Sequence, residues 1–387
     1  MVFALNEGKP VVPIQTSRDV KLPLLLARRN WIDFSVDYEE GFHSLLCFLN
    51  GDDHSMKQPV LQSITGVAPF DFGPEIARYT AGFTGREWLK QNIEDWLSDL
   101  KNRVLIIIGE PGIGKSAIAA WISQQFSNKV LGIHFCTHRN TRTLNVFEFV
   151  ANIVGQLHSQ LPEYAKIVET RKPESRRTTA SDAFRELVIE PSRLMISPNH
   201  ACFFIIDSLD EALLQEGENI VDILSEHAFD LPIWLKFMAT TRPEDDVIRK
   251  IRKLSTYELN AHRRENLEDV KTYIGNKLHN LDLESKFNKK VPSLIHAIER
   301  IAQGNFLYAT LVTDALENNT LTIDEIGELM PGLSCYYDKA FKRLFPDLKE
   351  YSDNYSDILK VLSVSLGPIP GSLISNVTGI NPEQLNL

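Results

Sequence analysis

The most informative stretch of this sequence is Gly109-Glu-Pro-Gly-Ile-Gly-Lys115-Ser116, which fits the pattern G-x-x-x-x-G-K-S/T at every fixed position. An apolar, β-branched run at residues 104–108 precedes it and predicts a buried strand. Residues 117–126 follow with good helix formers and with apolar side chains at helical spacing. Strand, glycine loop and helix together are the context in which backbone N–H groups and a helix N-terminus bind phosphate.

The loop therefore predicts a site that binds ATP or ADP together with Mg²⁺. The Lys115 ammonium is expected to reach the β- and γ-phosphates, and the Ser116 hydroxyl is expected to bind Mg²⁺. The alternative, a glycine turn without a ligand, is disfavoured by the strand and the helix on either side. The predicted nucleotide-binding residues of this stretch are Gly109, Glu110, Pro111, Gly112, Ile113, Gly114, Lys115, Ser116 and Ala117.

A second group of chemically important residues follows the apolar run at 202–206. Asp207 ends this run, so it is expected at the carboxyl end of a buried strand, where it can bind Mg²⁺ directly or through water. Asp210 and Glu211 follow in the next loop, where a carboxylate orients or deprotonates the attacking water. The alternative, in which the three acids only cap and solvate a helix, is disfavoured by their place downstream of a phosphate loop.

A third group lies after the predicted strand at 236–240. That strand delivers Thr241 and Arg242 to the sheet edge at which Asp207 is expected, because ligands bind outside the carboxyl ends of strands in open α/β sheets. An arginine there can contact the γ-phosphate and distinguish ATP from ADP. The alternative is a surface arginine that precedes the turn at Pro243.

Apolar strand patterns alternate with longer helical stretches over residues 104–259. The predicted strands are 104–108, 132–136, 202–206, 236–240 and 256–259. This alternation predicts an α/β fold of the P-loop NTPase type, with a parallel sheet between two layers of helices. After residue 260 only helical patterns remain, at 267–278, 292–303, 307–316, 338–345, 357–365 and 373–377, which predicts a helical domain.

Before the phosphate loop, the segment Phe83-Thr-Gly-Arg-Glu87 opens a predicted amphipathic helix that runs to Leu100. Thr84 and Glu87 are spaced as a capping box for its start. Residues 53–80 contain several prolines and glycines and no lasting period, so they are predicted to be a linker.

Composition excludes several classes of protein. A net charge of −10 argues against broad binding to DNA or membranes, and the basic segment 171–177 is interpreted as a solvated loop, with a nucleic-acid patch as the minor alternative. The four cysteines are far apart, which is typical of a protein from a reducing cytosol. No apolar run is long enough to cross a bilayer and no signal sequence opens the chain, so a cytoplasmic location without membrane contact is expected.

Taken together, the phosphate loop, the D-S-x-D-E form at 207–211 and the Thr-Thr-Arg-Pro segment at 240–243 resemble the NACHT subgroup of STAND NTPases. The segment at 83–87 is similar to one that packs near the adenine in this class, which implies that Gly85 and Arg86 bind nucleotide. Gly304-Asn-Phe-Leu307 resembles the segment that closes over the nucleotide. The resemblance implies a nucleotide-binding domain at 81–260, a helical domain at 261–346 and a partial winged-helix domain at 347–387.

Residues 1–52 resemble the C-terminal third of a TIR domain. The similarity is carried by Lys9-Pro-Val-Val-Pro-Ile14, by Leu22-Pro-Leu-Leu-Leu26 and by Trp31-Ile-Asp-Phe34, and the alternative is an unrelated α/β leader. In TIR domains that cleave NAD, the essential glutamate lies upstream of this part, so the resemblance implies no NAD cleavage by this chain.

The NACHT resemblance implies a signalling ATPase of innate immunity in which ATP binding drives self-association and slow hydrolysis resets the switch. The hinge is expected near Asn260, and a trigger is expected to act through a C-terminal sensor that this sequence lacks. One departure is that no histidine follows His296, whereas many relatives hold ADP with a winged-helix histidine. The competing hypotheses are an AAA+-type motor acting on nucleic acid or protein, and a nucleotide-gated scaffold that does not hydrolyse ATP.

Overall fold

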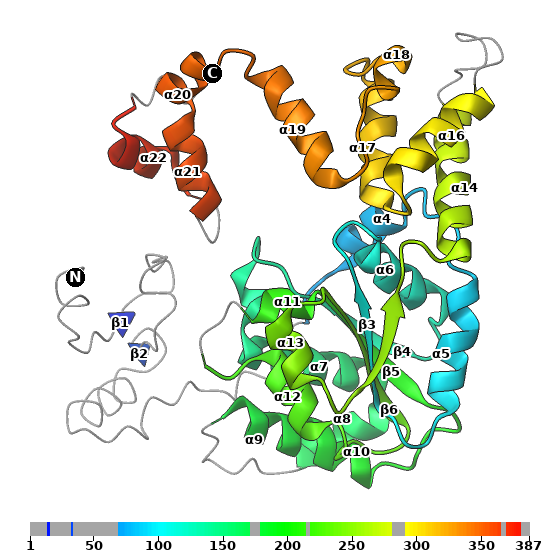
Figure 1. Ribbon diagram of the computed structural model, residues 1–387. Coiled ribbons are helices and arrows are strands. Elements are labelled where there is room, and N and C mark those ends of the chain that lie inside the picture. The colour runs from blue at the N-terminus through cyan, green and yellow to red at the C-terminus, as the bar shows by residue number, and fades with distance from the viewer. Residues whose placement is uncertain are drawn as a thin grey trace.

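The protein is described by a computed structural model that covers residues 14–15, 32–33, 69–170, 179–213, 217–280, 291–364 and 369–380. Figure 1 shows three parts in these residues: a sheet enclosed by helices, a group of helices beyond one edge of the sheet, and a C-terminal group of helices reached through one long helix. None of the described helices is both long enough and apolar enough to cross a membrane.

The central sheet contains all five predicted strands: β3 (Val104–Gly109), β4 (Val130–Phe135), β5 (Cys202–Asp207), β6 (Leu235–Thr241) and β7 (Ser255–Leu259). They pair in the order β4-β5-β6-β3-β7, and every pairing is parallel. Because the strands are parallel, the residues that end each of them meet at one edge of the sheet. The predicted parallel α/β sheet is therefore confirmed.

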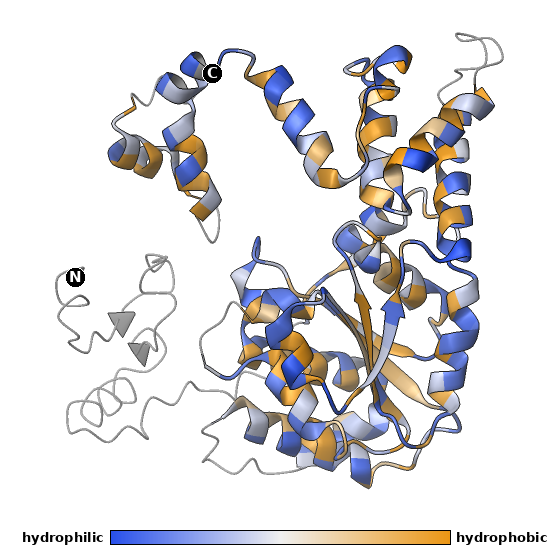
Figure 2. Cartoon of the chain, in the orientation of Figure 1, coloured by the Kyte–Doolittle hydropathy of each residue, from blue (hydrophilic) through white to orange (hydrophobic). Residues whose placement is uncertain are grey.

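Helices cover both faces of the sheet, and each face has its own apolar core. Val104 and Ile106 belong to one core and Leu105 and Ile107 to the other, as the twofold period of a strand buried on both sides requires. Figure 2 shows β7 as largely polar and the strands behind it as apolar, while the helices carry both polar and apolar residues. This is the three-layer P-loop NTPase fold that the sequence predicts.

One core is built by helices that precede β4: α4 (Gly73–Thr80), α5 (Trp88–Ser98) and α6 (Lys115–Gln125). The other is built by η3 (Thr141–Leu144), α7 (Val146–Gln160), α8 (Pro162–Thr170), α9 (Ala180–Phe184), the π-helical turn η4 (Arg185–Ile189), α11 (Leu209–Ala212), α12 (Ile220–His227) and α13 (Asp245–Lys250). The short helix α10 (Glu190–Leu194) follows η4 directly.

Two local predictions differ from the structure before the phosphate loop. The helix predicted from 83 begins only at Trp88, and its N-cap Glu87 makes no side-chain capping bond, so the predicted capping box is wrong. Gly85 and Arg86 have φ values of +84° and +69°, which are outside the helical region, and the chain therefore turns before the helix starts. Residues 73–80 of the predicted linker form α4, whose Tyr79 ring stacks on Phe135 at 5.6 Å.

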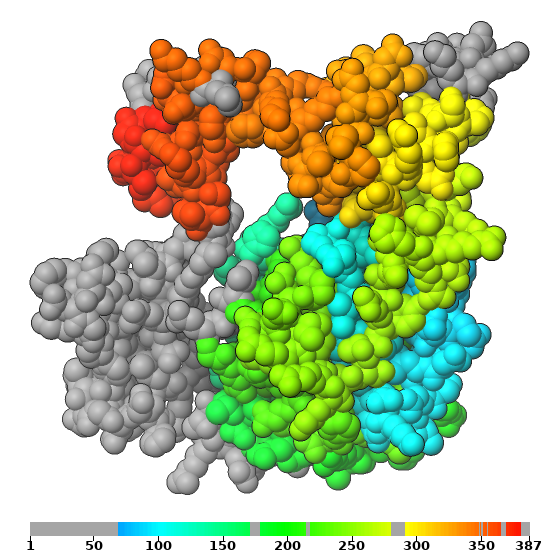
Figure 3. Space-filling view, viewed as in Figure 1, coloured from blue at the N-terminus to red at the C-terminus, as the bar shows by residue number. Residues whose placement is uncertain are grey.

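Beyond the sheet, a separate apolar core is shared by α14 (Arg264–Asn280), α16 (Val291–Ala302), α17 (Phe306–Glu317) and α18 (Ile323–Ile326). The chain continues through α19 (Leu333–Leu344), α20 (Leu348–Asn354), α21 (Ser356–Val364) and α22 (Gly371–Thr378). The helical patterns read after residue 260 are confirmed, while α18 and α20 are short helices that the sequence did not indicate. Figure 3 shows an opening between the C-terminal helices and the rest of the described chain.

The N-terminal segment is described at two places only. β1 (Ile14–Gln15) and β2 (Ile32–Asp33) pair in parallel. The remainder of the TIR-like segment 1–52, most of the linker and the basic loop at 171–177 lie outside the described residues.

Candidate nucleotide-binding site

The phosphate loop joins the carboxyl end of β3 to the first residue of α6. Gly112 and Gly114 have φ values of +81° and +96°, a region that glycine enters without the steric penalty of a Cβ atom. Gly114 is also the N-cap of α6, so the free N–H groups at the start of this helix face the loop. The predicted strand, loop and helix are therefore all present in the order that phosphate binding requires.

The Lys115 side chain is folded into the loop and is 8% exposed. Its ammonium donates hydrogen bonds to Gly109 O at 2.6 Å and to Glu110 O at 3.1 Å. Burial lowers the pKa of Lys115, and the carboxylates of Asp210 and Asp207 oppose that shift. Because the hydrogen bonds of this buried ammonium go to carbonyl groups of the loop, the ammonium is well placed to bind an anion there.

Asp207 lies at the end of β5 and is 2% exposed. Its carboxylate accepts hydrogen bonds from Thr240 Oγ1 at 2.6 Å and from Ser208 Oγ at 3.1 Å. Burial raises the pKa of Asp207, and these hydrogen bonds oppose the rise. Strand β6 separates β5 from β3, yet Ser116 in the first turn of α6 is near enough to Asp207 to lower the pKa of its carboxyl.

The Ser116 hydroxyl and the Asp207 carboxylate are thus the two groups at this edge that suit Mg²⁺. The ion takes oxygen ligands and keeps several waters beside one or two protein groups and the phosphates of a nucleotide. The buried carboxyl oxygens of Asp207 and the hydroxyl of Ser116 fit that requirement.

Asp210 and Arg242, which are distant in sequence, are held together at the same edge. Asp210 Oδ1 accepts from the Arg242 backbone N–H at 3.0 Å, and Asp210 Oδ2 lies 3.2 Å from Arg242 Nε. The Asp210 side chain is 8% exposed, whereas Arg242 is 46% exposed. Arg242 can therefore reach a ligand while Asp210 fixes its backbone.

Glu211 is bound by a residue that sequence reasoning missed. Glu211 Oε2 accepts from the His138 backbone N–H and lies 2.8 Å from His138 Nδ1. His138 follows β4, so the rule that ligands bind beyond the carboxyl ends of parallel strands was the one signal that could have found it. The Glu211 side chain remains 19% exposed, which leaves it access to water.

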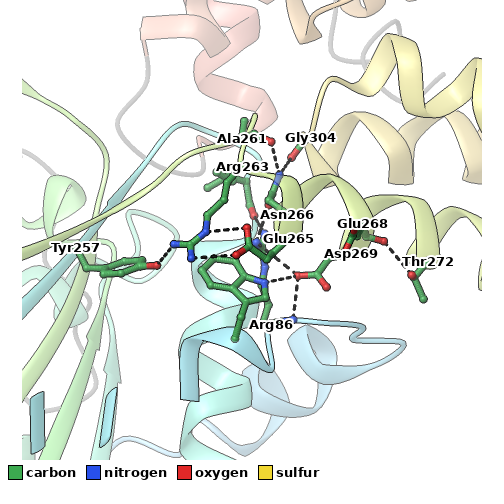
Figure 4. Close-up of polar contacts among 12 residues, drawn as sticks. Arg86, Tyr257, Ala261, Arg263, Glu265, Asn266, Glu268, Asp269, Thr272 and Gly304 are labelled. Atoms are coloured by element: carbon green, nitrogen blue, oxygen red, sulfur yellow. Dashed lines mark hydrogen bonds and ion pairs between the residues drawn. The ribbon is translucent and has the colours of Figure 1, made fainter. Parts of the chain in front are cut away.

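The two predicted residues of the pre-loop segment lie against the helical domain. Arg86 is 2% exposed, and its Nη2 donates to Ile113 O in the phosphate loop at 2.7 Å. Its Nη1 donates to Asn266 Oδ1 at 2.6 Å, and burial lowers the pKa of Arg86 to about 10 (Figure 4). A Cβ atom on Gly85 would lie 2.2 Å from Asp269 Oδ1, so this contact needs a glycine. Nucleotide binding by Gly85 and Arg86 stays a prediction.

The turn before α17 also reaches the phosphate loop. Asn305 Nδ2 donates to Pro111 O at 2.8 Å, and Leu307 N donates to Gly112 O at 3.0 Å. The sequence predicted that this segment closes over the nucleotide. The structure places it on the backbone of the loop that would hold the phosphates.

The part of the chain that contains the predicted site residues is similar to a known protein family. Residues 84–242 match the family described as Nephrocystin 3, N-terminal. The match begins in the pre-loop segment and ends at Arg242, so it spans every candidate site residue. No curated protein matches the chain.

Among solved structures, two mutants of RuvB from Thermotoga maritima are similar at 13% and 14% identity. Each has a TM-score of 0.34 and covers 79% of this chain and 85% of that chain. PCH-2 of C. elegans is similar at 11% identity and a TM-score of 0.36, covering 70% of this chain and 72% of that chain. At these scores the site rests on its own geometry.

Proposed function

We propose that this chain is an ATP/ADP-switched signalling ATPase of the STAND type, in which ATP binding drives self-association and slow hydrolysis resets the switch. The observation that carries the proposal is the buried ammonium of Lys115 inside a glycine loop, at the sheet edge where the buried carboxyl of Asp207 also lies. The match of residues 84–242 to the nephrocystin 3 N-terminal family supports it, as does the resemblance of the motifs to NACHT proteins.

In the proposed reaction, water attacks the γ-phosphorus and ADP leaves as inorganic phosphate forms. Lys115 and the N–H groups of the loop bind the phosphate oxygens. Ser116 and Asp207 would hold Mg²⁺, which when bound supplies positive charge against the phosphates. Glu211 accepts a proton from the attacking water, and Asp210 keeps Arg242 in place.

Discrimination between ATP and ADP is assigned to Arg242. Its guanidinium is half-exposed and already contacts a carboxylate, so a γ-phosphate offers it a second anionic partner that ADP lacks. ATP binding would thereby draw Arg242 toward the phosphates. The resulting difference in binding free energy between ATP and ADP is the energetic basis of the proposed switch.

The moving joint is proposed to lie beyond α18, in place of the hinge expected near Asn260. The junction near Asn260 is crossed by the bonds from Asn305 and Leu307 to the phosphate loop. By contrast, α19 begins after Gly332, whose φ is +97°, and none of its residues is buried. The helical group α14–α18 would then move with the sheet.

The test uses the full chain in three measurements. Calorimetry measures ADP and ATP-analogue affinity, phosphate release measures turnover with and without DNA or RNA, and size exclusion compares ADP with a non-hydrolysable ATP analogue. A switch gives slow turnover that nucleic acid does not change and a larger species with the ATP analogue. Fast turnover stimulated by nucleic acid or protein indicates a motor, binding without turnover indicates a scaffold, and absence of binding contradicts the proposal.

A further inference from the structure

Three successive carbonyl groups of the phosphate loop are bonded to residues outside the loop. Pro111 O accepts from Asn305 Nδ2 at 2.8 Å, and Gly112 O accepts from Leu307 N at 3.0 Å. Ile113 O accepts from Arg86 Nη2 at 2.7 Å. The outward face of the loop is therefore held by Asn305 and Leu307 at the start of α17 and by Arg86 of the pre-loop segment.

The inward face follows from peptide geometry. A trans peptide is planar, so the carbonyl of one residue and the N–H of the next point in opposite directions. With the carbonyls of Pro111 and Ile113 held outward, the N–H groups of Gly112 and Gly114 face the other way, into the loop that holds the Lys115 ammonium. A set of convergent N–H groups is the arrangement that binds phosphate oxygens.

The external donors are themselves connected by buried hydrogen bonds, as Figure 4 shows around Asn266. Arg86 Nη1 donates to Asn266 Oδ1 at 2.6 Å, and Asn266 Nδ2 donates to Gly304 O at 2.9 Å. Gly304 directly precedes Asn305, and Asn266 is fully buried. In such a buried network each hydrogen bond is strong and its loss is costly, so the network holds Arg86, Asn266 and the turn at Gly304 rigidly together.

Asn305 has two separate tasks in this network. Its Oδ1 accepts from Tyr308 N at 3.0 Å and so caps α17, while its Nδ2 holds Pro111 O. The contact is tight, because a Cβ atom on Gly112 would lie 2.5 Å from Asn305 Oδ1. The glycine at position 112 therefore serves the helical domain as well as the loop conformation.

We propose that Asn305 and Arg86 are positioning residues that preorganise the phosphate loop, so that docking of the helical domain sets the affinity for nucleotide. This inference rests on the proposed nucleotide binding. Preorganised donors bind an anion without reorganisation at the moment of binding. Because coupling between two binding events is reciprocal, bound nucleotide must in turn strengthen the docking of α14 and α17.

The decisive variant is Asn305→Ser. Serine is as good an N-cap as asparagine, so α17 keeps its cap, but its short hydroxyl replaces the amide donor to Pro111 O. Aspartate is unsuitable because its charge would itself repel phosphate. The matched control is Asn145→Ser, at the N-cap of α7, whose side chain accepts from Phe147 N and Glu148 N.

We expect ADP affinity to fall roughly tenfold in Asn305→Ser and to stay unchanged in Asn145→Ser, with similar melting temperatures in the absence of nucleotide. Hydrogen exchange adds a readout that a purely structural role would not move. ADP should slow amide exchange in α14 and α17 of the unchanged protein, and this slowing should be largely lost in Asn305→Ser.

Arg86→Lys is the second variant, for the case that Asn305→Ser does not fold. Lysine keeps the charge but cannot donate to Ile113 O and Asn266 Oδ1 with a planar fork, so ADP affinity should fall here too. Unchanged ADP affinity in the folded variants overturns the inference while leaving the proposed function in place. Absence of ADP and ATP binding by the unchanged protein rejects the proposed function itself.

Discussion

Two junctions of the helical region can be compared, and they are built in opposite ways. The inner junction consists of the contacts that Arg86, Asn266, Asp269, Asn305 and Leu307 make between the sheet domain and α14–α17. The outer junction is α19, which joins α18 to α20 and contains no buried residue. Leu344, at the end of α19, is 73% exposed.

The inner junction is polar, and it is buried at Arg86 and Asn266, whereas Leu307 at its rim is 38% exposed. Asp269 Oδ2 accepts from the Arg86 backbone N–H at 3.0 Å and from Trp88 Nε1 at 2.9 Å. The outer junction is held by half-buried and exposed groups, such as Tyr336, whose Oη donates to Leu311 O at 3.2 Å, and Lys339, which lies 3.2 Å from Glu328. The difference teaches that the inner junction, with its buried hydrogen bond between Arg86 and Asn266, is suited to transmit a change, whereas α19, which contains no buried residue, is suited to move.

The largest effect is expected from a variant that abolishes nucleotide binding in the phosphate loop, which the inner junction holds. Lys115→Ala should abolish ATP and ADP binding, because the anion would lose the ammonium that faces it inside the loop. Calorimetry measures the loss, and ADP-dependent protection of α17 in hydrogen exchange should disappear with it. Unchanged affinity would contradict the phosphate-loop assignment.

A direct comparison of the junctions uses one carboxylate in each. Asp269→Ala should lower the free energy of unfolding by about 3 kcal/mol, because it leaves the buried Arg86 without its ion-pair partner. Asp338→Ala removes an exposed pair with Lys342 on α19 and should change it by less than about 0.5 kcal/mol. Urea unfolding measures both, and equal losses would remove the distinction between the junctions.

Hydrolysis can be separated from binding at Glu211. Glu211→Gln should keep ATP affinity and lower turnover on the order of a hundredfold, since the amide cannot accept the proton of the attacking water. The amide oxygen can still accept from the His138 backbone, so the local geometry is preserved. If Asp210→Asn abolishes turnover and Glu211→Gln does not, the two roles are reversed.

The smallest expected effect concerns ATP against ADP. Arg242→Ala should weaken binding of a non-hydrolysable ATP analogue by roughly tenfold and leave ADP affinity nearly unchanged, because the proposed partner is the γ-phosphate alone. Paired titrations with the two nucleotides measure the ratio. Equal losses would make Arg242 a structural partner of Asp210.

Local patterns were sufficient for the sheet and for the loop. The strands were readable because residues 104–108 and 202–206 are continuous apolar runs, which is how strands buried on both faces look. Asp207 was predictable because it follows such a run. Binding of Mg²⁺ by Ser116 and Asp207 stays a prediction, and it rests on the placement of both residues at one edge of the sheet.

What the sequence could not show depends on contacts between distant residues. His138 and Glu211 are 73 positions apart, and the place of both after parallel strands puts them at one sheet edge without indicating that they contact each other. The capping-box pattern at Thr84 failed because Arg86 takes a left-handed conformation that its buried bonds to Ile113 and Asn266 hold in place. A local rule has no access to such tertiary compensation.

The wide sequence separation within the inner junction has a consequence for the order in which the protein is made. Asn305 and Pro111 are 194 positions apart, and Arg86 and Asn266 are 180 apart. At a synthesis rate of roughly 5–20 residues per second, the phosphate loop leaves the ribosome about 10–40 seconds before Asn305 does. The sheet can therefore form first, and the carbonyls of Pro111 and Gly112 remain without their donors until the start of α17 has been translated.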